Sequence, residues 1–354
     1  MRGLNPAIPA AHNYFRPMSE MQAWILDQSP GSYRWGTVER PEPGDDDVAV
    51  RPVASALNHM DLWVTRGMPK PKLPHVPGCD VAGVVEAVGE RVDGVAVGDE
   101  VVVNPAVAPL DAVIRYGNDS PLGKGFGIVG EQRWGGHGEL VVVPGRNVRP
   151  RPAHRSWAEC AAYSLTTLTA WRMLRRARLA AGETLLVVGI GGGVSMAALA
   201  LGVHLGAEVY VTSRDQAKID AAVAQGAAAG FDSAGEWPVR ADVVVESVGP
   251  ATWDRSINAL KPGGRVAVCG GTSGPKVELN LPKLFFKQIE VIGSTMGSYE
   301  EFDQVTRLVD QGLPVAVDQE LDLADYPTAL ERLEAGDQLG KIVLRHGDID
   351  SAHA

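Results

Sequence analysis

A glycine-rich turn near the middle of the chain has the residue types needed to bind a dinucleotide. In LLVVGIGGGVSMAALALGVHL, residues 185–205, a short apolar run turns at clustered glycines into an alanine-rich segment of helical composition. Glycines let the backbone approach a pyrophosphate, whose charge is stabilised by the free amides at the following helix N-terminus. We therefore predict a nucleotide site rather than a turn without a ligand, although Ser195 replaces the last glycine of G-x-G-x-x-G. The predicted contacts are Gly189, Gly191, Gly192, Gly193 and Val194.

The end of the next apolar run, EVYVTS, distinguishes between cofactors because it meets the adenosine ribose. A carboxylate at this place would bind an unmodified ribose hydroxyl and repel a phosphate. The chain instead offers Ser213 and Arg214, with Lys218 four residues further on. Two cations and a hydroxyl favour the 2′-phosphate of NADP(H), and the alternative for Arg214 is a solvated surface arginine.

Length and composition limit the kinds of protein that can hold such a site. The chain of 354 residues is too long for one small core, so we expect two domains. Its net charge of −10 leaves no basic face for nucleic acid. No apolar run reaches the roughly 18 residues of a membrane span. Three widely spaced cysteines favour a reducing compartment over a disulfide framework, so we expect a cytoplasmic protein.

Two kinds of strand pattern divide the chain. From residue 21 to about 150, short valine-rich runs such as VAGVVEAVG are broken by Gly, Pro and Asp, which is typical of an antiparallel barrel. Residues 155–178 place apolar and small residues at helical spacing, and we predict one helix there. Apolar strand candidates then alternate with helical segments, which indicates a parallel sheet covered on both faces.

These patterns predict an α/β protein with a substrate cleft between two domains. The expected divisions are a disordered extension over 1–20, the first part of a catalytic domain over 21–156, an NADP(H)-binding domain over 157–296, a return to the catalytic domain over 297–345 and a tail over 346–354.

Several motifs in a fixed order resemble the medium-chain dehydrogenase/reductase superfamily over nearly the whole chain. They are ALNHMD at 56–61, GCDVAGVV at 78–85, GDEVV at 98–102, LTAW at 168–171, the glycine turn, LKPGGRV at 260–266 and GKIVL at 340–344. The resemblance implies a Rossmann doubly wound parallel sheet plus a GroES-like antiparallel β-barrel catalytic domain. It also implies hydride transfer with NAD(H) or NADP(H) and, commonly, a homodimer or homotetramer.

The alcohol dehydrogenase branch of this superfamily holds a catalytic zinc through three side chains that are mostly absent here. Asn58, Cys79 and Leu165 occupy the three ligand positions, and Asp80 replaces a neighbouring Glu. An open zinc site needs three ligands from His, Cys and carboxylates. We therefore expect no metal and interpret Cys79 as a small buried thiol. An unorthodox site of Cys79 and Asp80 with His59 is the alternative.

The structural zinc lobe of the same branch is also altered. Four closely spaced cysteines would be expected after Asn104-Pro105, but residues 106–130 contain none. A Cys-type zinc site cannot form without thiolates. We expect this loop to be held by packing instead.

The loss of a metal narrows the chemistry that the chain can perform. Zinc polarises a substrate oxygen and stabilises an alkoxide, which a neutral Asn or Leu cannot do. An acceptor that is already electron-poor, such as a quinone or an α,β-unsaturated carbonyl, mainly needs alignment with the nicotinamide and hydrogen bonds to its oxygen. The zinc-free quinone oxidoreductase branch resembles this chain at Asn58 and Asp61.

We therefore predict an NADPH-dependent, zinc-independent oxidoreductase that acts on a small activated acceptor, with neither nucleic acid nor a membrane as a partner. One alternative is a zinc-dependent alcohol dehydrogenase with divergent ligands. Another is an NADPH-binding protein without turnover.

The resemblance also suggests catalytic roles, each with a simpler alternative. Asn58 is expected to fix the nicotinamide or the acceptor oxygen, or else to cap a turn. His59 could supply a proton, since the ordinary pKa of histidine lies near neutrality, or it could make only a local hydrogen bond. Asp61 fits a structural or ribose-side acceptor better than a general base.

The remaining predicted cofactor contacts lie where parallel strands end or follow from the resemblance. Thr169 corresponds to a residue that touches the nicotinamide, although threonines inside helices usually bond back to the backbone. Ligands bind at the carboxyl ends of parallel strands. The residues predicted at this rim are Val248, Cys269, Gly270 and Ser294.

Overall fold

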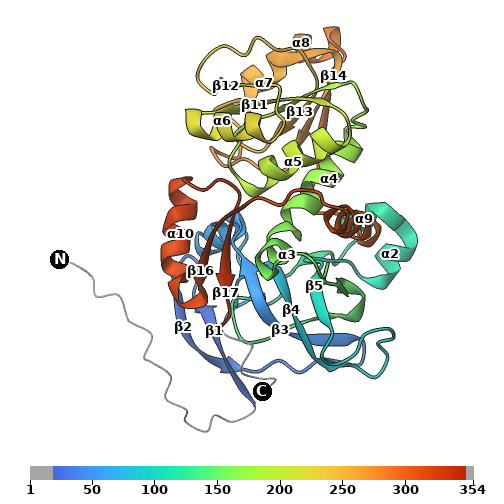
Figure 1. Ribbon diagram of the computed structural model, residues 1–354, viewed down its shortest axis with the longest axis vertical. Coiled ribbons are helices and arrows are strands. Elements are labelled where there is room, and N and C mark those ends of the chain that lie inside the picture. The colour runs from blue at the N-terminus through green and yellow to red at the C-terminus, as the bar shows by residue number, and fades with distance from the viewer. Residues whose placement is uncertain (1–18, 348–354) are drawn as a thin grey trace, which may run out of the picture.

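The computed structural model describes residues 19–347 and arranges them in two stacked parts, a strand-rich lower part and an α/β upper part (Figure 1). The predicted extension and tail lie outside the described residues except for residues 19, 20, 346 and 347. Within the described residues, no helix has the length and apolar character to cross a membrane.

The lower part is built on a seven-stranded sheet in the order β16-β17-β3-β4-β5-β9, with β8 paired to β3. Its pairs are antiparallel except for β16 with β17. The strands are β3 (Asp47–Ala56), β4 (Asp80–Val88), β5 (Glu100–Val103), β8 (Val141–Pro144), β9 (Val148–Pro150), β16 (Val317–Asp322) and β17 (Lys341–Arg345). Two smaller ladders join β1 (Glu20–Leu26) to β2 (Tyr33–Glu39) and β6 (Ala106–Val107) to β7 (Gly127–Ile128).

The upper part is a six-stranded parallel sheet in the order β12-β11-β10-β13-β14-β15. The strands are β10 (Thr184–Val187), β11 (Glu208–Ser213), β12 (Ala229–Asp232), β13 (Ala241–Glu246), β14 (Leu260–Val268) and β15 (Glu290–Gly293). The helices between them are α5 (Gly193–His204), α6 (Gln216–Ala224), α7 (Trp253–Ala259) and α8 (Leu281–Phe286). This strand order is the doubly wound one, and it reverses beside β10, where such sheets bind ligands. The predicted fold class is confirmed.

The other helices connect or cover the two sheets. They are α1 (His59–Thr65), α2 (Leu110–Tyr116), α3 (Trp157–Tyr163), α4 (Thr166–Arg176), α9 (Tyr299–Asp310) and α10 (Tyr326–Ala335), with 3₁₀ turns η1 (Gly117–Leu122), η2 (Gly145–Asn147) and η3 (Leu323–Asp325). The prediction of one helix over 155–178 is wrong, because the chain breaks between α3 and α4. At this break the amide of Leu165 donates to Oδ1 of Asp80 at 2.7 Å.

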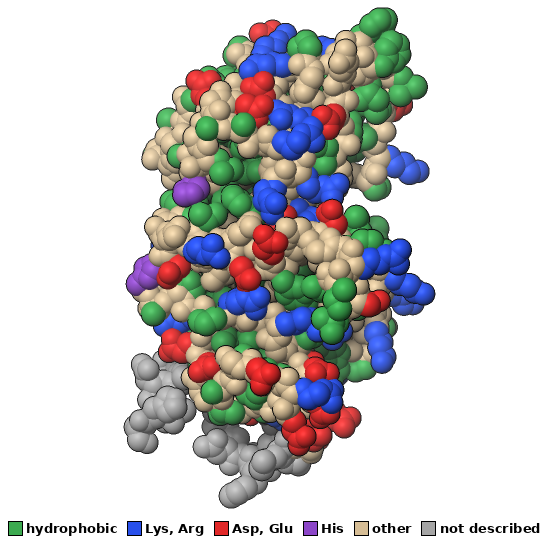
Figure 2. Space-filling view, turned by 90° about the vertical axis from the view of Figure 1, so that its right-hand side faces the viewer, with side chains coloured by type: hydrophobic (Ala, Val, Ile, Leu, Met, Phe, Trp, Pro, Cys, Tyr) green, Lys and Arg blue, Asp and Glu red, His purple; other side chains and the backbone are tan. Residues whose placement is uncertain are grey.

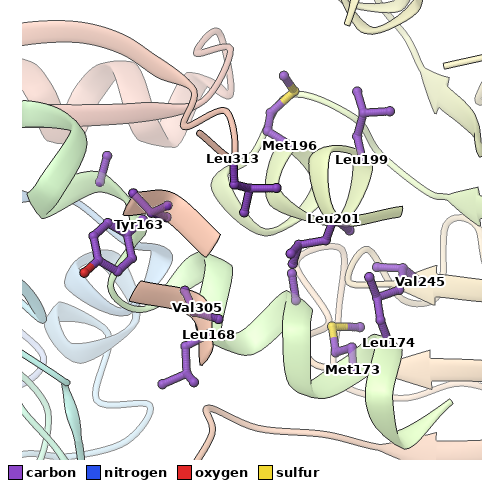
Figure 3. Close-up of a cluster of buried hydrophobic side chains, with 14 of the residues drawn as sticks. Tyr163, Leu168, Met173, Leu174, Met196, Leu199, Leu201, Val245, Val305 and Leu313 are labelled. Atoms are coloured by element: carbon purple, nitrogen blue, oxygen red, sulfur yellow. The ribbon is translucent and has the colours of Figure 1, made fainter. Parts of the chain in front are cut away.

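One apolar core joins the two parts. It contains Tyr163 and Leu168 from the α3–α4 region, Leu199 from α5, Val245 from β13 and Val305 from α9 (Figure 3). Because side chains from both sheets and the connecting helices pack in a single cluster, the joint positions the end of β10 relative to the strand-rich part.

The lobe over residues 106–130 is held by charge as well as by packing, contrary to the prediction of packing alone. Arg172 of α4 is buried and donates to the carbonyl of Asn118 at 2.7 Å and to Asp119 and Glu301 at 2.9 Å each. Glu301 belongs to α9, which lies beside the lobe in Figure 1. The guanidinium therefore fastens the lobe to two helices.

Candidate active site

The glycine turn follows β10 and has the tight geometry that its sequence predicts. Gly189 and Gly191 have φ values of +75° and +130°, which other residues rarely adopt. A Cβ on Gly191 would lie 2.9 Å from Cδ of Lys218, and a Cβ on Gly193 would lie 2.7 Å from Cδ of Lys341. Glycine is therefore needed both for the turn and for the close approach of two lysines.

The residues predicted to select the cofactor lie around the carboxyl end of β11. Arg214 is exposed and makes no hydrogen bond or ion pair with any other residue of the described chain. Lys218 reaches back over the turn and donates to the carbonyl of Gly336 at 2.6 Å. Ser213 accepts from the amide of Asp215, and the Asp215 carboxylate accepts from the amide of Ala217 at the start of α6. The one carboxylate at this strand end is thus engaged in capping.

The predicted rim residues lie at the ends of β13, β14 and β15, as expected. The Ser294 hydroxyl is buried and finds no hydrogen-bond partner among residues 19–347, so it is available to a ligand. Burial and the charge of Glu246 raise the pKa of Cys269 to about 12, so its thiol stays protonated and is a poor nucleophile. Thr169 donates to the carbonyl of Leu165 at 2.8 Å, the back-bond common for threonine in a helix.

Three side chains from three elements meet in a buried cluster. Asn58 precedes α1, Asp80 begins β4 and Lys341 begins β17. Lys341 Nζ donates to Oδ1 of Asn58 and to Oδ2 of Asp80 at 2.7 Å each, and also to the carbonyl of Leu57. Asn58 Nδ2 donates to Oδ2 of Asp80 at 2.9 Å. All three side chains are buried.

The protonation states of this region follow from burial and from the Lys341 charge. Burial raises the pKa of Asp80, and the Lys341 ammonium and the amide of Asn58 oppose that rise. Burial lowers the pKa of His59, as do the charges of Lys341 and Arg66. A neutral imidazole is therefore expected at pH 7, which weakens the predicted role of His59 as a proton donor.

Asp61 is held in a separate buried cluster behind Asn58. Its carboxylate accepts from the backbone N–H of Asn58 at 2.7 Å and from the hydroxyl of Tyr326 at 3.1 Å, and it lies 3.4 Å from Nε2 of His137. Burial alone would raise the pKa of Asp61, but the nearby His137 and the hydrogen bond from the backbone N–H of Asn58 hold it below its usual value. Ser55 continues the chain of contacts from Nδ1 of His137 at 2.8 Å. These contacts support the structural interpretation of Asp61, which fixes the turn that carries Asn58.

Lys341 is the functional candidate that the sequence did not single out. It appeared only within the GKIVL motif, although a lone charge at the start of an apolar strand signals a buried ion pair. Its partners lie far away in sequence, so only the folded chain identifies them.

The residues at the expected metal position do not fit a zinc ion. Among residues 19–347, no three side chains of His, Cys, Asp or Glu gather in a group that could hold a metal. Burial and the carboxylates of Asp61, Asp80 and Glu131 raise the pKa of Cys79 well above its ordinary value. Asn58 and Leu165, at the other two ligand positions, offer zinc no thiolate, imidazole or carboxylate. The ammonium of Lys341 would also repel a divalent cation. These side chains therefore support a mechanism in which no step passes through a metal.

Comparisons with known proteins agree with this two-part architecture. Residues 44–153 match the model of the alcohol dehydrogenase GroES-like domain, and residues 193–311 match that of the zinc-binding dehydrogenases. A 2-methylene-furan-3-one reductase of Solanum lycopersicum is 30% identical over 338 residues, which cover 92% of this chain and 79% of the relative. A quinone oxidoreductase of Pseudomonas aeruginosa is 30% identical over 325 residues, which cover 86% of this chain and 92% of the relative. The crystal structure of an NAD-dependent alcohol dehydrogenase is 36% identical with a TM-score of 0.87, covering 92% of this chain and 100% of that one.

Proposed function

From the premise that this chain belongs to the medium-chain dehydrogenase/reductase superfamily and is an oxidoreductase, we propose that it is an NADPH-dependent reductase of activated acceptors that works without zinc. The acceptor class is a quinone or an α,β-unsaturated carbonyl compound. The observation that carries this proposal is the contact of Asn58 and Asp80 with the ammonium of Lys341.

The relatives support the acceptor class without deciding it. The names of two of them specify a furanone with an exocyclic double bond and a quinone, both of which are electron-poor acceptors. An alcohol dehydrogenase is similar in structure, so fold alone does not separate the two chemistries. The composition of the pocket favours reduction, because Asn58 and Leu165 supply no Lewis acid to activate a simple alcohol.

The preference for NADPH rests on the end of β11. Ser213 stands where a ribose-binding carboxylate would select NAD(H), and Arg214 is free to pair with a 2′-phosphate. Lys218 lies against Gly191 of the glycine turn and adds a second positive charge near the proposed phosphate site.

In the proposed mechanism the cofactor supplies the hydride, and the side chains bind and orient the reactants. The glycine turn and the start of α5 hold the pyrophosphate, while Arg214 and Lys218 hold the 2′-phosphate. Asn58 donates an amide N–H to the acceptor oxygen, where negative charge develops during hydride transfer. The apolar core between the two parts keeps the rim and Asn58 in fixed relative positions.

An acceptor panel with a metal control tests this proposal. Purified protein with NADPH should reduce quinones and enones at least ~100-fold faster than the matching saturated ketones, since conjugation lowers the barrier that a metal would otherwise lower. Dialysis against a chelator should leave the rate unchanged. Zinc-restored oxidation of alcohols would favour the alcohol dehydrogenase alternative. Tight NADPH binding without turnover on any acceptor would favour the non-catalytic alternative.

A homodimer formed through the edge of the parallel sheet is part of this proposal. Strand β15 ends the sheet, and the adjoining surface exposes Leu281, Phe285, Phe286 and Val291, with Phe286 exposed to 80%. Figure 2 shows hydrophobic side chains gathered at the upper end of the molecule. An unpaired edge flanked by apolar side chains favours pairing with another strand. Light scattering should give a dimer for the native chain and a monomer for Phe286→Asp. The cytoplasmic location remains a prediction from the cysteine content.

A further inference from the structure

We propose that Lys341 is a positioning residue that locks the side-chain amide of Asn58 in a single orientation, with one N–H left for the acceptor oxygen. This inference rests on the proposed function, because it assigns a role to Asn58 in that reaction. The residues that carry it are Lys341, Asn58 and Asp80, which meet from β17, the start of α1 and β4.

The two charges determine which end of the amide faces which partner. An ammonium can only donate hydrogen bonds, and an ionised carboxylate can only accept them. Oδ1 of Asn58 therefore has to face Lys341, and Nδ2 has to face Asp80, as the contacts at 2.7 and 2.9 Å show. Turning the amide by half a revolution would place its N–H groups against the ammonium and its oxygen against the carboxylate. The orientation thus follows from the charges and not from the shape of the amide.

The hydrogen-bond inventory leaves one donor free in this cluster. Lys341 has three N–H groups, which are taken up by the carbonyl of Leu57, Oδ1 of Asn58 and Oδ2 of Asp80. It therefore has none to offer the acceptor. Asn58 has two N–H groups, of which one goes to Asp80. The other has only the carbonyl of Ala56 at 3.5 Å, the outer limit of a hydrogen bond.

Lys341 also connects the side-chain amide of Asn58 to the glycine turn. A Cβ on Gly193, at the start of α5, would lie 2.7 Å from Cδ of Lys341, so the lysine stem runs against the glycine turn. The adjacent Gly340 donates its backbone N–H to the carbonyl of Gly191 at 2.8 Å. The same short segment therefore contacts the turn predicted to hold the pyrophosphate and the amide predicted to hold the acceptor. This arrangement fixes the position of the Asn58 amide relative to the glycine turn.

The structure places Lys341 where the superfamily resemblance expects the environment of a metal, but it acts differently from a metal. A metal ion would bind the acceptor oxygen directly. The ammonium instead holds the group that binds this oxygen. Loss of the Lys341 charge should therefore destabilise the transition state and lower kcat, while the affinity for the substrate stays nearly the same.

The first test compares Lys341→Met with Asn58→Ala and with the double variant. Methionine keeps the length of the side chain and removes its charge. We expect each single variant to lower kcat by ~10²–10³-fold, the usual loss of one oxyanion donor, with little change in the KM of the acceptor. In the Asn58→Ala background, Lys341→Met should cost less than ~3-fold, because the two residues act as a unit. Independent, multiplying losses would overturn the proposal.

Two controls separate positioning from stability. Lys261→Met removes another ion-paired lysine, which lies 2.6 Å from Asp242 in the parallel-sheet part, and it should leave kcat unchanged. The double variant Lys341→Met with Asp80→Asn removes both charges together, so thermal stability should recover while kcat stays low. Recovery of kcat in that variant would show that Lys341 only balances the charge of Asp80.

A spectroscopic measurement distinguishes failure of this inference from failure of the proposed function. The side-chain amide of Asn58 can be assigned in ¹⁵N-labelled protein by comparison with Asn58→Ala. In the native chain we expect the two N–H signals to be displaced from those of a solvated asparagine and to exchange slowly with water. In Lys341→Met they should move toward the solvated values and exchange faster, while staying two separate signals because rotation about the amide C–N bond is slow. Unchanged signals would overturn the positioning role. If the native chain reduced no acceptor, the proposed function would fail, and these signals would still report whether the amide is locked.

Discussion

Two buried cations lie in the two regions that correspond to the zinc sites of the alcohol dehydrogenase branch, and they differ in what surrounds them. Lys341 lies in the candidate site, is 4% exposed and pairs with the fully buried Asp80. Arg172 lies beneath the lobe of residues 106–130, is 2% exposed and pairs with the buried Glu301. Lys341 makes three hydrogen bonds with its three N–H groups, and Arg172 makes three with its five.

The difference lies in the neighbour that each cation holds. Lys341 holds an amide that keeps an almost unused N–H, and its stem lies against Gly193 of the glycine turn. Arg172 holds backbone and carboxylate groups that have no further chemistry to offer, and it joins α4, α9 and the lobe. A buried ion pair can therefore support chemistry when it orients a polar group that is not fully satisfied, and otherwise it serves only to fasten elements together.

The largest expected effect is on stability, at the lobe. Arg172→Leu removes the buried partner of Glu301, which keeps the partly exposed Arg175 at 3.5 Å and the amide of Ser298 at 2.9 Å. The free energy of unfolding should therefore fall by about 3 kcal/mol, the lower end of the cost of breaking a buried pair. The kcat of the remaining folded protein should be unchanged, because the hydrogen bonds of Arg172 go to Asn118, Asp119 and Glu301 and not to the Asn58 cluster. Urea unfolding and active-site-normalised rates would measure both quantities. A large loss of kcat in the folded fraction would contradict the contrast between the two regions.

The next effect is on catalysis, at the acceptor site. Asn58→Ala should lower kcat by ~10²–10³-fold, because it removes the donor to the acceptor oxygen. The melting temperature should fall far less than in Arg172→Leu. Steady-state kinetics with an enone and NADPH provide the measurement, and a native rate in this variant would remove Asn58 from the mechanism.

A smaller effect is expected at the cofactor end. Arg214→Ala should weaken NADPH binding by ~10–100-fold, equivalent to one or two charge-assisted hydrogen bonds, and should barely change NADH binding. Fluorescence titration with both cofactors gives the ratio. Equal losses for NADPH and NADH would show that Arg214 does not contact the 2′-phosphate.

The smallest expected effect is a pH dependence of the free energy of unfolding that comes from His59, beside Asn58. The pKa of His59 is lowered in the folded chain by burial and by Lys341, so below its ordinary value of about 6.5 the unfolded chain binds the extra proton first. Above about pH 6.5 His59 is neutral in both states, so it does not reduce the free energy of unfolding. As the pH falls below that value, the unfolded chain gains a proton that the folded chain does not bind, and the folded state loses stability. His59→Gln should reduce this loss between about pH 6.5 and 5 in unfolding experiments. An identical pH profile in both proteins would contradict the lowered pKa.

Much of the architecture could be predicted from local patterns. The glycine turn, the apolar strands after it and the valine-rich runs before it led to the two sheets that the structure contains. The helix over residues 155–178 was predicted as one, because its apolar spacing continues across Ser164 and Leu165. The break depends on Asp80, whose carboxylate accepts the amide of Leu165 from a distant strand. A propensity pattern contains no information about such a partner.

The candidate site divides in the same way. The glycines, Ser213 and Arg214 were identifiable because short motifs carry their own geometry, and they lie at the ends of β10 and β11, where they were expected. Asn58 was identifiable from its motif and lies at the start of α1. Their roles remain predictions. Lys341 and Arg172 were not identified, because their roles depend on Asp80 and Glu301, which other elements contribute.

The sequence by itself determined the strand–turn–helix unit, the absence of cysteines from the lobe and the residue types at the former metal positions, since all of these are properties of the chain read in order. The tertiary structure alone decided that a lysine from the last strand neutralises Asp80 and orients Asn58. The physical reason is that burial makes an isolated charge costly, so the fold has to bring an opposite charge to it, and that charge can come from any part of the chain.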